Sequence, residues 1–342
     1  MRIAVLDIGG TSIKSGLWDG TQLSDVKETA TMAQEGGAAV AARAADILRG
    51  YGCLDAIGIS TAGQVNTTEG SIHYANPNIP GYTGTPLKTV MEQKFQVPTA
   101  VENDVNAAAL GELYFGAARG EESFLCLTYG TGVGGAIVIN REVFHGANWS
   151  GGYFGGILVH PEARHWSVWG SGEQSAKEQE PGANSAKEQG LDVDFAKKRW
   201  PDANICGAKE ESSQIPRVEE LSGCYERYAS ATALVRAAQE VDASLTDGRR
   251  VFAAFERPEV RKVIDAWIDE TVWGLITLIH IFDPPMVVLG GGIFAQPYVS
   301  REVKRRVRDR IDPGFTKVRI ETALLGNSAG MIGAAALAQK LI

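Results

Sequence analysis

A strand that runs straight into an acid and two glycines opens this chain, and that junction limits the possible folds more than any other feature. Residues 1–6 have the apolar pattern of a buried strand, and Asp7, Gly9 and Gly10 follow directly. Glycines at a turn between strands tolerate positive φ and let backbone N–H groups approach an oxyanion. Apolar residues alternate after the turn, which predicts a second strand and not the helix that follows a Walker loop.

Three polar side chains at this junction are suited to a phosphate site. Asp7 is a candidate Mg²⁺ ligand, and Thr11 and Lys14 are candidates to contact phosphate oxygens. Taken by itself, the segment fits an ordinary Gly-Gly hairpin with a surface acid equally well. The choice between these interpretations depends on the rest of the chain.

Length and composition favour a globular protein of two domains. At 342 residues the chain exceeds the usual size of one domain, and substrate clefts often form between domains. Hydrophobic residues make up 44% and charged residues 22%, as in an ordinary globular protein. The formal net charge of −8 and the pI near 5.3 give no general attraction to nucleic acid.

The sequence shows no sign of a membrane, secretory or disulfide-rich protein. No apolar stretch approaches the ~20 residues of a membrane span, and the first residues lack the layout of a signal peptide, so we expect a cytoplasmic protein. The four cysteines include no Cys-x-x-Cys pair, so we expect neither a disulfide framework nor a thiolate zinc site.

The hydrophobic pattern alternates between the strand and helix periods, which is typical of an α/β protein. Strands are expected at residues 3–8, 13–18, 55–60, 98–102, 123–128, 136–139 and 286–289. Helices are expected at residues 37–48, 106–113, 224–241, 259–282 and from about residue 327.

The opening design of strand, glycines and strand occurs a second time. The apolar run at residues 123–128 enters Tyr129 and the glycine-rich segment 130–135, and another apolar strand follows. Gly130, Thr131 and Gly132 are therefore candidates to offer backbone donors to a phosphate. Two such hairpins in two domains could grip one nucleotide from both sides.

The boundary between the two domains is expected near residue 118. Residues 1–118 form the predicted N-terminal α/β domain, with a helix at about 327–342 packing back on it, and residues 119–326 form the C-terminal α/β domain. Residues 165–217 are polar and weakly periodic, and they are interpreted as an insertion, either solvated or a dedicated binding element.

Asp104 is the side chain on which the chemistry depends most. It follows Asn103 at the end of a predicted strand and the start of a helix, where the helix N-terminus helps to keep a carboxylate ionised. There it could accept the proton of an attacking hydroxyl, or it could simply cap the helix. The run Gly290, Gly291 and Gly292 would let a nucleoside lie close to the backbone, although tight helix packing explains it equally well.

Several of these segments together resemble the ROK family of sugar kinases and repressors. The resemblance is carried, in the family's order, by residues 6–14, 101–112, 127–139, 281–293 and 326–337. It implies the two-domain actin-like ATPase fold, which is ribonuclease H-like, with an interdomain cleft that closes over ATP and a sugar. Because the phosphate hairpin begins at residue 7, we expect a kinase and not a repressor with a preceding DNA-binding domain.

The resemblance also implies roles for individual residues. Asp104 would be the catalytic base, and Asp7 would lie near Mg²⁺, directly or through water. The implied nucleotide and phosphate contacts are Asp7, Gly9, Gly10, Thr11, Lys14, Gly130, Thr131, Gly132, Gly290, Gly291 and Gly292. The implied substrate contacts are Gly63, Asn78, Asn103, Asp104 and Tyr153.

The sequence departs from the family in two places. Where many relatives have Glu-x-Gly-His for the sugar and a zinc ion, this chain has Tyr153 and Gly156. The zinc cysteine cluster is reduced to Cys224, so no structural zinc is expected. Loss of a sugar-binding carboxylate should alter glucose binding, and Trp149, Tyr153 and Phe154 would form either an aromatic wall for a glucoside or part of the core.

We therefore expect an ATP- and Mg²⁺-dependent sugar kinase that phosphorylates a primary hydroxyl, expected to be the 6-hydroxyl, of a hexose, a hexose derivative or a glucoside. The resemblance suggests a homodimer whose partner is a small-molecule sugar, with no nucleic acid and no membrane. Three alternatives stay open: a non-catalytic protein that responds to sugar or nucleotide, an actin-like ATPase that acts on a protein, and polyphosphate as the phosphoryl donor.

Overall fold

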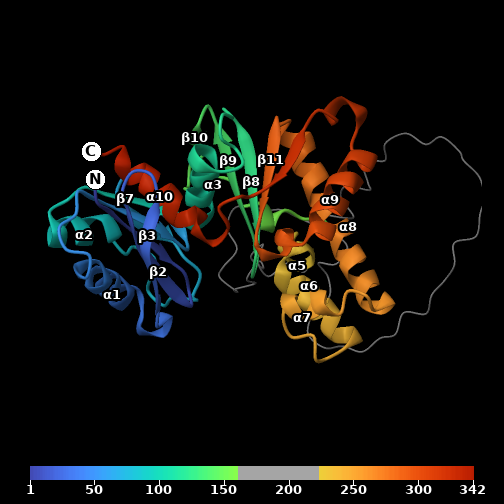
Figure 1. Ribbon diagram of the computed structural model, residues 1–342, viewed down its shortest axis with the longest axis horizontal. Coiled ribbons are helices and arrows are strands. Elements are labelled where there is room, and N and C mark those ends of the chain that lie inside the picture. The colour runs from blue at the N-terminus through green and yellow to red at the C-terminus, as the bar shows by residue number, and fades with distance from the viewer. Residues whose placement is uncertain (161–222) are drawn as a thin grey trace, which may run out of the picture.

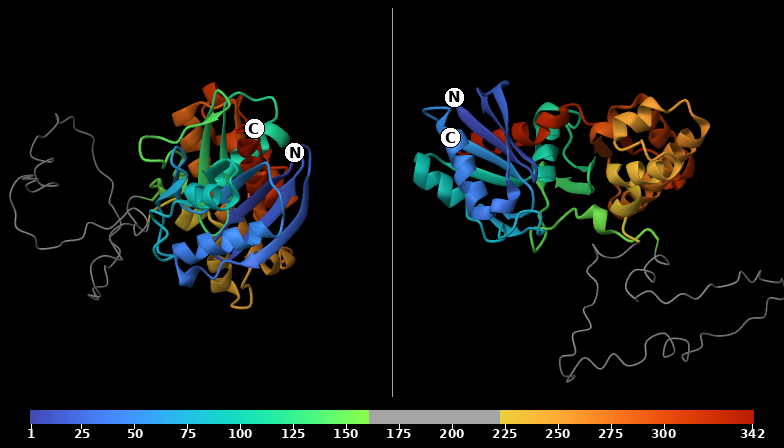
Figure 2. Two further views of the ribbon diagram at one scale, coloured as in Figure 1. Left: turned by 90° about the vertical axis from the view of Figure 1, so that its left-hand side faces the viewer. Right: turned by 90° about the horizontal axis from the view of Figure 1, so that it is seen from below.

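The computed structural model describes residues 1–160 and 223–342, and the predicted insertion at residues 165–217 lies outside the described residues. Two five-stranded sheets organise the chain, one in each half of the molecule (Figures 1 and 2). The N-terminus and the C-terminus lie close together in the half that contains the first sheet.

The two sheets have the same strand order. The first sheet runs β3-β2-β1-β4-β7 and consists of β1 (Ile3–Ile8), β2 (Ser12–Trp18), β3 (Leu23–Ala30), β4 (Ala56–Thr61) and β7 (Thr99–Asn103). The second runs β10-β9-β8-β11-β12 and consists of β8 (Phe124–Tyr129), β9 (Val133–Ile139), β10 (Glu142–Val143), β11 (Met286–Gly290) and β12 (Arg319–Thr322). In both, three antiparallel strands are followed by two parallel strands. The resemblance between the two glycine hairpins thus extends to whole sheets.

Helices flank both sheets. Beside the first sheet lie α1 (Gly37–Arg49) and α2 (Leu87–Phe95), and α3 (Asp104–Phe115) and α10 (Ala329–Gln339) lie between the sheets (Figure 1). On the far side of the second sheet lie α5 (Glu226–Ala229), α6 (Ala231–Val241), α7 (Gly248–Ala253), α8 (Pro258–Phe282) and α9 (Pro297–Arg310). A small hairpin, β5 (Gln64–Asn66) and β6 (Ser71–Tyr74), extends from the first half.

Close backbone contact holds the last helix against the first half of the chain. A Cβ atom on Gly333 of α10 would lie 1.7 Å from the carbonyl oxygen of Ala107, and one on Gly111 of α3 would lie 2.5 Å from that of Ala329. Only glycine fits at such distances. Helix α10 also contacts β1, β4 and β7, while its assignment to the N-terminal domain and the domain boundary near residue 118 stay predictions.

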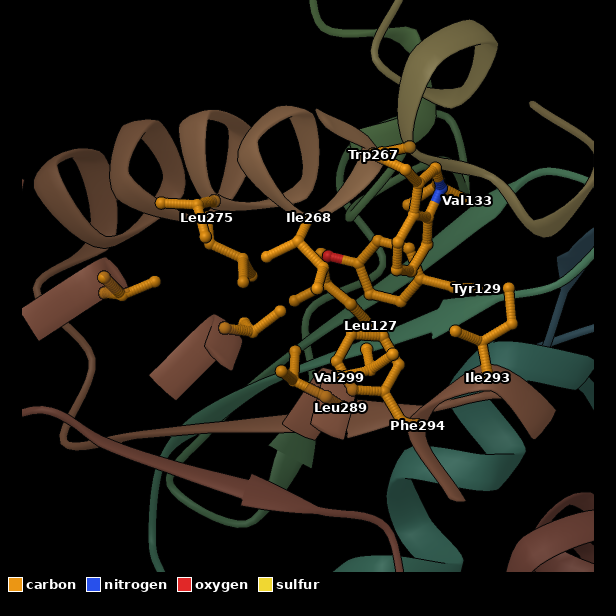
Figure 3. Packing of buried hydrophobic residues seen from close by; sticks show 14 of the residues in the cluster. Leu127, Tyr129, Val133, Trp267, Ile268, Leu275, Leu289, Ile293, Phe294 and Val299 are labelled. Carbon is orange, nitrogen blue, oxygen red and sulfur yellow. The ribbon is translucent and has the colours of Figure 1, made fainter. Parts of the chain in front are cut away.

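Each sheet has its own hydrophobic core, and the core of the second sheet anchors its glycine hairpin. The rings of Tyr129, Trp267 and Phe294 point toward one another there (Figure 3), with centroids 5.0 to 6.5 Å apart. The hydroxyls of Tyr129 and Tyr225 lie 2.9 Å apart, and Tyr225 donates to the carbonyl of Thr271 at 2.7 Å. These contacts therefore fix the position of Tyr129, after which the second glycine hairpin begins.

The predicted elements differ from the observed ones in several places, and β5, β6, β10, β12, α2 and α7 were not expected at all. Strand β3 was not expected, because seven of its eight residues are exposed and give no buried-strand pattern. The helix predicted at 224–241 is two helices, since Ser230 ends α5 and its hydroxyl accepts from Ala233 N at 3.1 Å to cap α6. Phe154 is buried in the core of the second sheet and does not belong to an exposed aromatic wall.

Candidate active site

The first glycine hairpin is pinned at its tip by a buried threonine. Gly9 N donates to Ser12 O at 3.0 Å, which closes the turn between β1 and β2. The hydroxyl of Thr31 donates to Gly9 O at 2.6 Å, and Thr31 N donates to Thr11 O at 2.9 Å. Gly10 and Thr11 remain exposed, so the turn presents main chain to solvent in a fixed shape.

Asp7 lies at the base of this hairpin, directly across from Lys14 in the register of β1 and β2. The hydroxyl of Ser60 on β4 donates to Asp7 Oδ1 at 2.7 Å. A Cβ on Gly330 of α10 would lie 3.3 Å from the same oxygen, so the helix packs closely over the carboxylate. Burial raises the pKa of Asp7, while the Ser60 hydrogen bond and the positive charge of Lys14 act in the opposite direction.

Asn103, and not Asp104, caps helix α3. The side-chain oxygen of Asn103 accepts from the backbone N–H groups of Val105 and Asn106 at 3.0 and 3.2 Å. Its amide group donates to the carbonyl of Gly63 at 2.9 Å and to Asp104 Oδ1 at 2.8 Å. Gly63 adopts φ +94°, a left-handed turn that places this carbonyl. The alternative that Asp104 serves as the cap is therefore wrong.

Asp104 is the first residue of α3, and its two oxygens differ in environment. Oδ1 accepts from Asn103 and from Val105 N at 2.9 Å, whereas Oδ2 has no hydrogen-bond partner among the described residues. The surrounding cavity walls desolvate the carboxylate, although solvent still reaches it, and the charge of Asp7 adds to this effect. Together they raise the pKa of Asp104 to about 6, which still leaves it mainly ionised at neutral pH.

The second glycine hairpin is closed by a hydrogen bond from Gly130 N to Gly132 O at 3.0 Å. Glu226, at the start of α5, lies against it, since a Cβ on Gly132 would come within 2.5 Å of Glu226 Oε2. A Cβ on Gly155 would lie 3.0 Å from the same oxygen. The two glycines thus make room for a carboxylate that the sequence interpretation missed.

The glycines of the hairpin tips are explained by space and not by backbone conformation. Gly9, Gly10, Gly130 and Gly132 are absent from the glycines with positive φ, so positive φ is not the reason for them, while the other expectation, an approach of the main chain to an oxyanion without a Cβ in the way, stays a prediction. A Cβ on Gly10 or Gly130 would meet no atom within 4 Å. At these positions the chain leaves open space directly over its main chain.

Three cavities meet around these elements. The central cavity, of about 460 Å³, is lined by Asp104, Asn103, Gly130, Gly132, Trp149 and Glu226, among others. The side cavity, of about 430 Å³, is lined by Gly10, Gly63, Asn78, Asn103, Tyr153 and Glu226, among others. The outer cavity, of about 560 Å³, is lined by Tyr129, Gly130, Arg249, Phe252, Gly292 and Gln296, among others.

The cavities bring together most of the residues singled out from the sequence. Asn103, Tyr153 and Glu226 line both the central and the side cavity, and Gly130 joins the central cavity to the outer one. Within the triple-glycine segment only Gly292 lines a cavity. Gly291, at φ +104°, packs on Tyr129, because a Cβ there would lie 2.2 Å from the carbonyl oxygen.

Tyr153 and Gly156 form one structural unit. A Cβ on Gly156 would lie 2.5 Å from a carbon of the Tyr153 ring, so the ring occupies the space that a side chain at position 156 would need. Tyr153 is 47% exposed and its other side faces the cavities. The two departures from the family pattern therefore depend on each other.

No group of three or more His, Cys, Asp or Glu side chains suited to a metal ion occurs in residues 1–160 and 223–342. Cys224 is buried, and His160 bonds Glu270 at 2.7 Å, while Glu162 lies outside the described residues. Within the same two ranges, none of the helices has the length and apolar character needed to cross a membrane.

Comparison with known proteins assigns the chain. A protein-family model with the description "ROK family" matches residues 3–174 and 221–341. Glucokinase from Streptomyces coelicolor is 29% identical over 98% of this chain and 96% of its own length. Beta-glucoside kinase from Listeria monocytogenes is 27% identical over 98% of this chain and 96% of its own length.

A solved structure gives the same result for the fold. A ROK family glucokinase from Streptomyces griseus, in complex with glucose and AMPPNP, superimposes with a TM-score of 0.71 at 26% identity, covering 99% of this chain and all of that one. The predicted two-domain actin-like fold is confirmed by this likeness together with the repeated sheet topology. The chain belongs to the ROK family and is a carbohydrate kinase.

Proposed function

We propose that this protein transfers the γ-phosphoryl group of ATP to the 6-hydroxyl of a hexose, a hexose derivative or a glucoside. The observation that carries the proposal is the position of Asp104 on the central cavity, beside the second glycine hairpin, with one carboxylate oxygen held and the other without a partner among the described residues. An acidic group with a pKa of about 6 is ionised at neutral pH and ready to accept a proton.

ATP fits the line of cavities that crosses the second hairpin. The outer cavity offers the exposed Arg249 and the open backbone of Gly292 to a nucleoside, and Gly130 leads from there into the central cavity. The main chain at Gly10 has open space above it, which suits phosphate oxygens, whereas the N–H of Gly130 is already bonded to Gly132 O. The Streptomyces griseus relative was solved with AMPPNP, which supports ATP as the donor.

The pair Asp7 and Asp104 fits a magnesium ion. Each carboxylate has a raised pKa, and the charge of Asp7 contributes to the shift of Asp104, so the two like charges interact. A divalent cation there relieves this repulsion, and oxygen ligands are what Mg²⁺ prefers. Asp7 would hold the ion, directly or through water, and the bound ion would neutralise charge on the phosphates.

The acceptor sugar lies against Asp104 in the central cavity. Asp104 Oδ2 takes the proton of the 6-hydroxyl as that oxygen bonds to the γ-phosphorus and ADP leaves. Glu226 and Asn78 are suited to hydrogen-bond the remaining hydroxyls from the cavity walls. Asn103 contributes mainly by holding Asp104, because both ends of its amide are engaged.

The Tyr153 ring favours an acceptor with an apolar substituent over free glucose. The ring covers Gly156 and presents its exposed face where many relatives have a carboxylate and an imidazole. Stacking of a sugar or an aglycone on this ring replaces the missing polar contacts. One relative carries the name beta-glucoside kinase, which supports this choice.

An ADP-release assay over hexoses, N-acetylhexosamines, fructose and β-glucosides tests the proposal. We expect turnover with at least one sugar and the highest kcat/KM with a β-glucoside. Silence across the panel with intact ATP binding would instead favour the non-catalytic alternative, and sugar-independent ATP hydrolysis would favour an ATPase. Polyphosphate replaces ATP in a parallel assay, and light scattering tests the homodimer that we also infer.

A further inference from the structure

A hydrogen bond between a histidine and a buried carboxylate joins the catalytic segment to the loop that forms the cavity wall. Glu102, which immediately precedes Asn103 and Asp104, is only 2% exposed. Its Oε2 lies 2.8 Å from Nε2 of His145, which is 43 residues away in the chain. Glu102 belongs to β7 of the first sheet, and His145 follows β10 of the second, so this contact bridges the two halves.

The other oxygen of Glu102 holds the start of helix α3. Glu102 Oε1 accepts from Asn103 N at 2.8 Å and from the side-chain amide of Asn106 at 3.1 Å. Asp104 lies between these two anchored residues. One carboxylate therefore fixes the backbone on both sides of the proposed base and also binds His145.

His145 in turn organises the loop at residues 144–153. Its carbonyl accepts from Gly151 N at 2.8 Å, which closes the loop on itself. Its ring packs edge-on against Trp149 with centroids 5.6 Å apart. Residues 149–153 line the central cavity, so the imidazole lies behind a wall that the acceptor would touch.

We propose that His145 is a positioning residue that sets the acceptor-binding loop at a fixed distance from Asp104 through the carboxylate of Glu102. This inference rests on the proposed function, because it assumes that the acceptor lies between the loop and Asp104. A buried carboxylate keeps its geometry only while its donors are present, so loss of the imidazole releases both the loop and the segment before Asp104.

Four variants of His145 and Glu102 test the proposal: H145A, H145Q, H145N and E102Q. The amide nitrogen of Gln can take the place of Nε2, whereas that of Asn falls nearer to Nδ1 and does not reach Glu102. We expect H145A and H145N to raise the acceptor KM by about 10-fold or more, and H145Q to stay within about 3-fold of the wild type. The nucleotide KM should change little in all of them. The matched control is H73A, because His73 is exposed on β6.

Hydrogen exchange supplies a readout that does not require activity. We expect faster exchange in residues 144–153 and 102–106 for H145A and H145N, and near-native exchange for H145Q. A double variant E102Q/H145A should exchange no faster than H145A alone, because the two side chains act as one unit.

Two results would overturn the inference: unchanged acceptor KM and exchange in H145A, or equal effects of H145Q and H145N. If the wild type phosphorylates no sugar but the exchange pattern is as expected, the proposed function fails while the tether between loop and base segment stands.

Discussion

The two glycine hairpins occupy equivalent places in two sheets of the same strand order, yet their surroundings differ. The first has Asp7 and Lys14 on facing positions of its strands and is pinned at its tip by Thr31. The second has Thr128 and Gly134 at the corresponding facing positions and borders Glu226 and two cavities. A repeated topology has thus been used for two tasks: we expect the first hairpin to hold charge near a metal and phosphates, and the second to offer bare main chain between nucleotide and acceptor.

The largest effect is expected at Asp104, which lines the central cavity together with the second hairpin. Replacing Asp104 with Asn keeps the shape of the side chain but removes the proton acceptor, so kcat should fall by about 10²- to 10⁴-fold. ADP release should fall by the same factor. Sugar and nucleotide binding, measured by calorimetry, should be retained. Asp46→Asn, a surface change on α1, serves as the matched control. Near-native turnover of D104N would remove Asp104 from the role of base.

Removing the charge of Asp7 in the first hairpin should change the pKa of Asp104. Asp104 must be ionised to accept a proton, so kcat/KM should fall as the pH drops through about 6, its raised pKa. Asp7→Asn removes a like charge, which lowers the pKa of Asp104 and moves this acid limb to lower pH. We also expect a loss of about 10²-fold in kcat, because the metal and phosphate charge lose a partner. The pH profile of kcat/KM is measured for the wild type and for D7N. If the acid limb does not move in D7N, the charge of Asp7 does not raise the pKa of Asp104.

Two alanine substitutions distinguish the halves of the second hairpin. Gly132→Ala would place a methyl group 2.5 Å from Glu226 Oε2, so Glu226 must move. We expect the acceptor KM to rise by about 10-fold, as for a lost charge-assisted hydrogen bond. Gly130→Ala meets no protein atom within 4 Å, so it should leave the acceptor KM unchanged and raise the nucleotide KM instead. Steady-state kinetics with each substrate varied would contradict this division if both variants acted on the same KM.

The smallest effect concerns the pin of the first hairpin. Thr31→Val keeps the shape of a fully buried side chain but removes its hydrogen bond to Gly9 O, which should lower the free energy of unfolding by about 1 kcal/mol. Urea denaturation measures this, with Thr68→Val at an exposed position as control. The nucleotide KM should also rise in T31V. If T31V keeps the wild-type free energy of unfolding and the wild-type nucleotide KM, the hydrogen bond from Thr31 is not needed to hold the turn of the first hairpin.

Local patterns predicted the first hairpin, the second hairpin and the junction at Asn103 and Asp104. Each of these combines a buried strand with a turn or helix start, and both signals lie within a few residues. Strand β3 escaped because an exposed edge strand is polar. The tip glycines were expected both to allow positive φ and to keep a Cβ away from an oxyanion. None of Gly9, Gly10, Gly130 and Gly132 has positive φ, whereas the space above Gly10 and Gly130 fits the second reason.

Contacts between distant segments could not be predicted in this way. Glu226 meets Gly132 across 94 residues, and His145 meets Glu102 across two sheets. Such pairs depend on how the two halves pack, which no local period records. An acid at the start of a helical run, as Glu226 is, was the one available signal, and alone it is typical of an ordinary helix N-terminus.

The identity of the phosphorylated atom tests the central claim most directly. Product from the best acceptor of the sugar panel is purified and examined by ³¹P–¹H correlation NMR. We predict that the phosphorus couples to the two methylene protons at C6, because Asp104 faces a primary hydroxyl in the central cavity. Coupling to a ring proton or to the anomeric proton, or release of free phosphate without a sugar ester, would contradict the account.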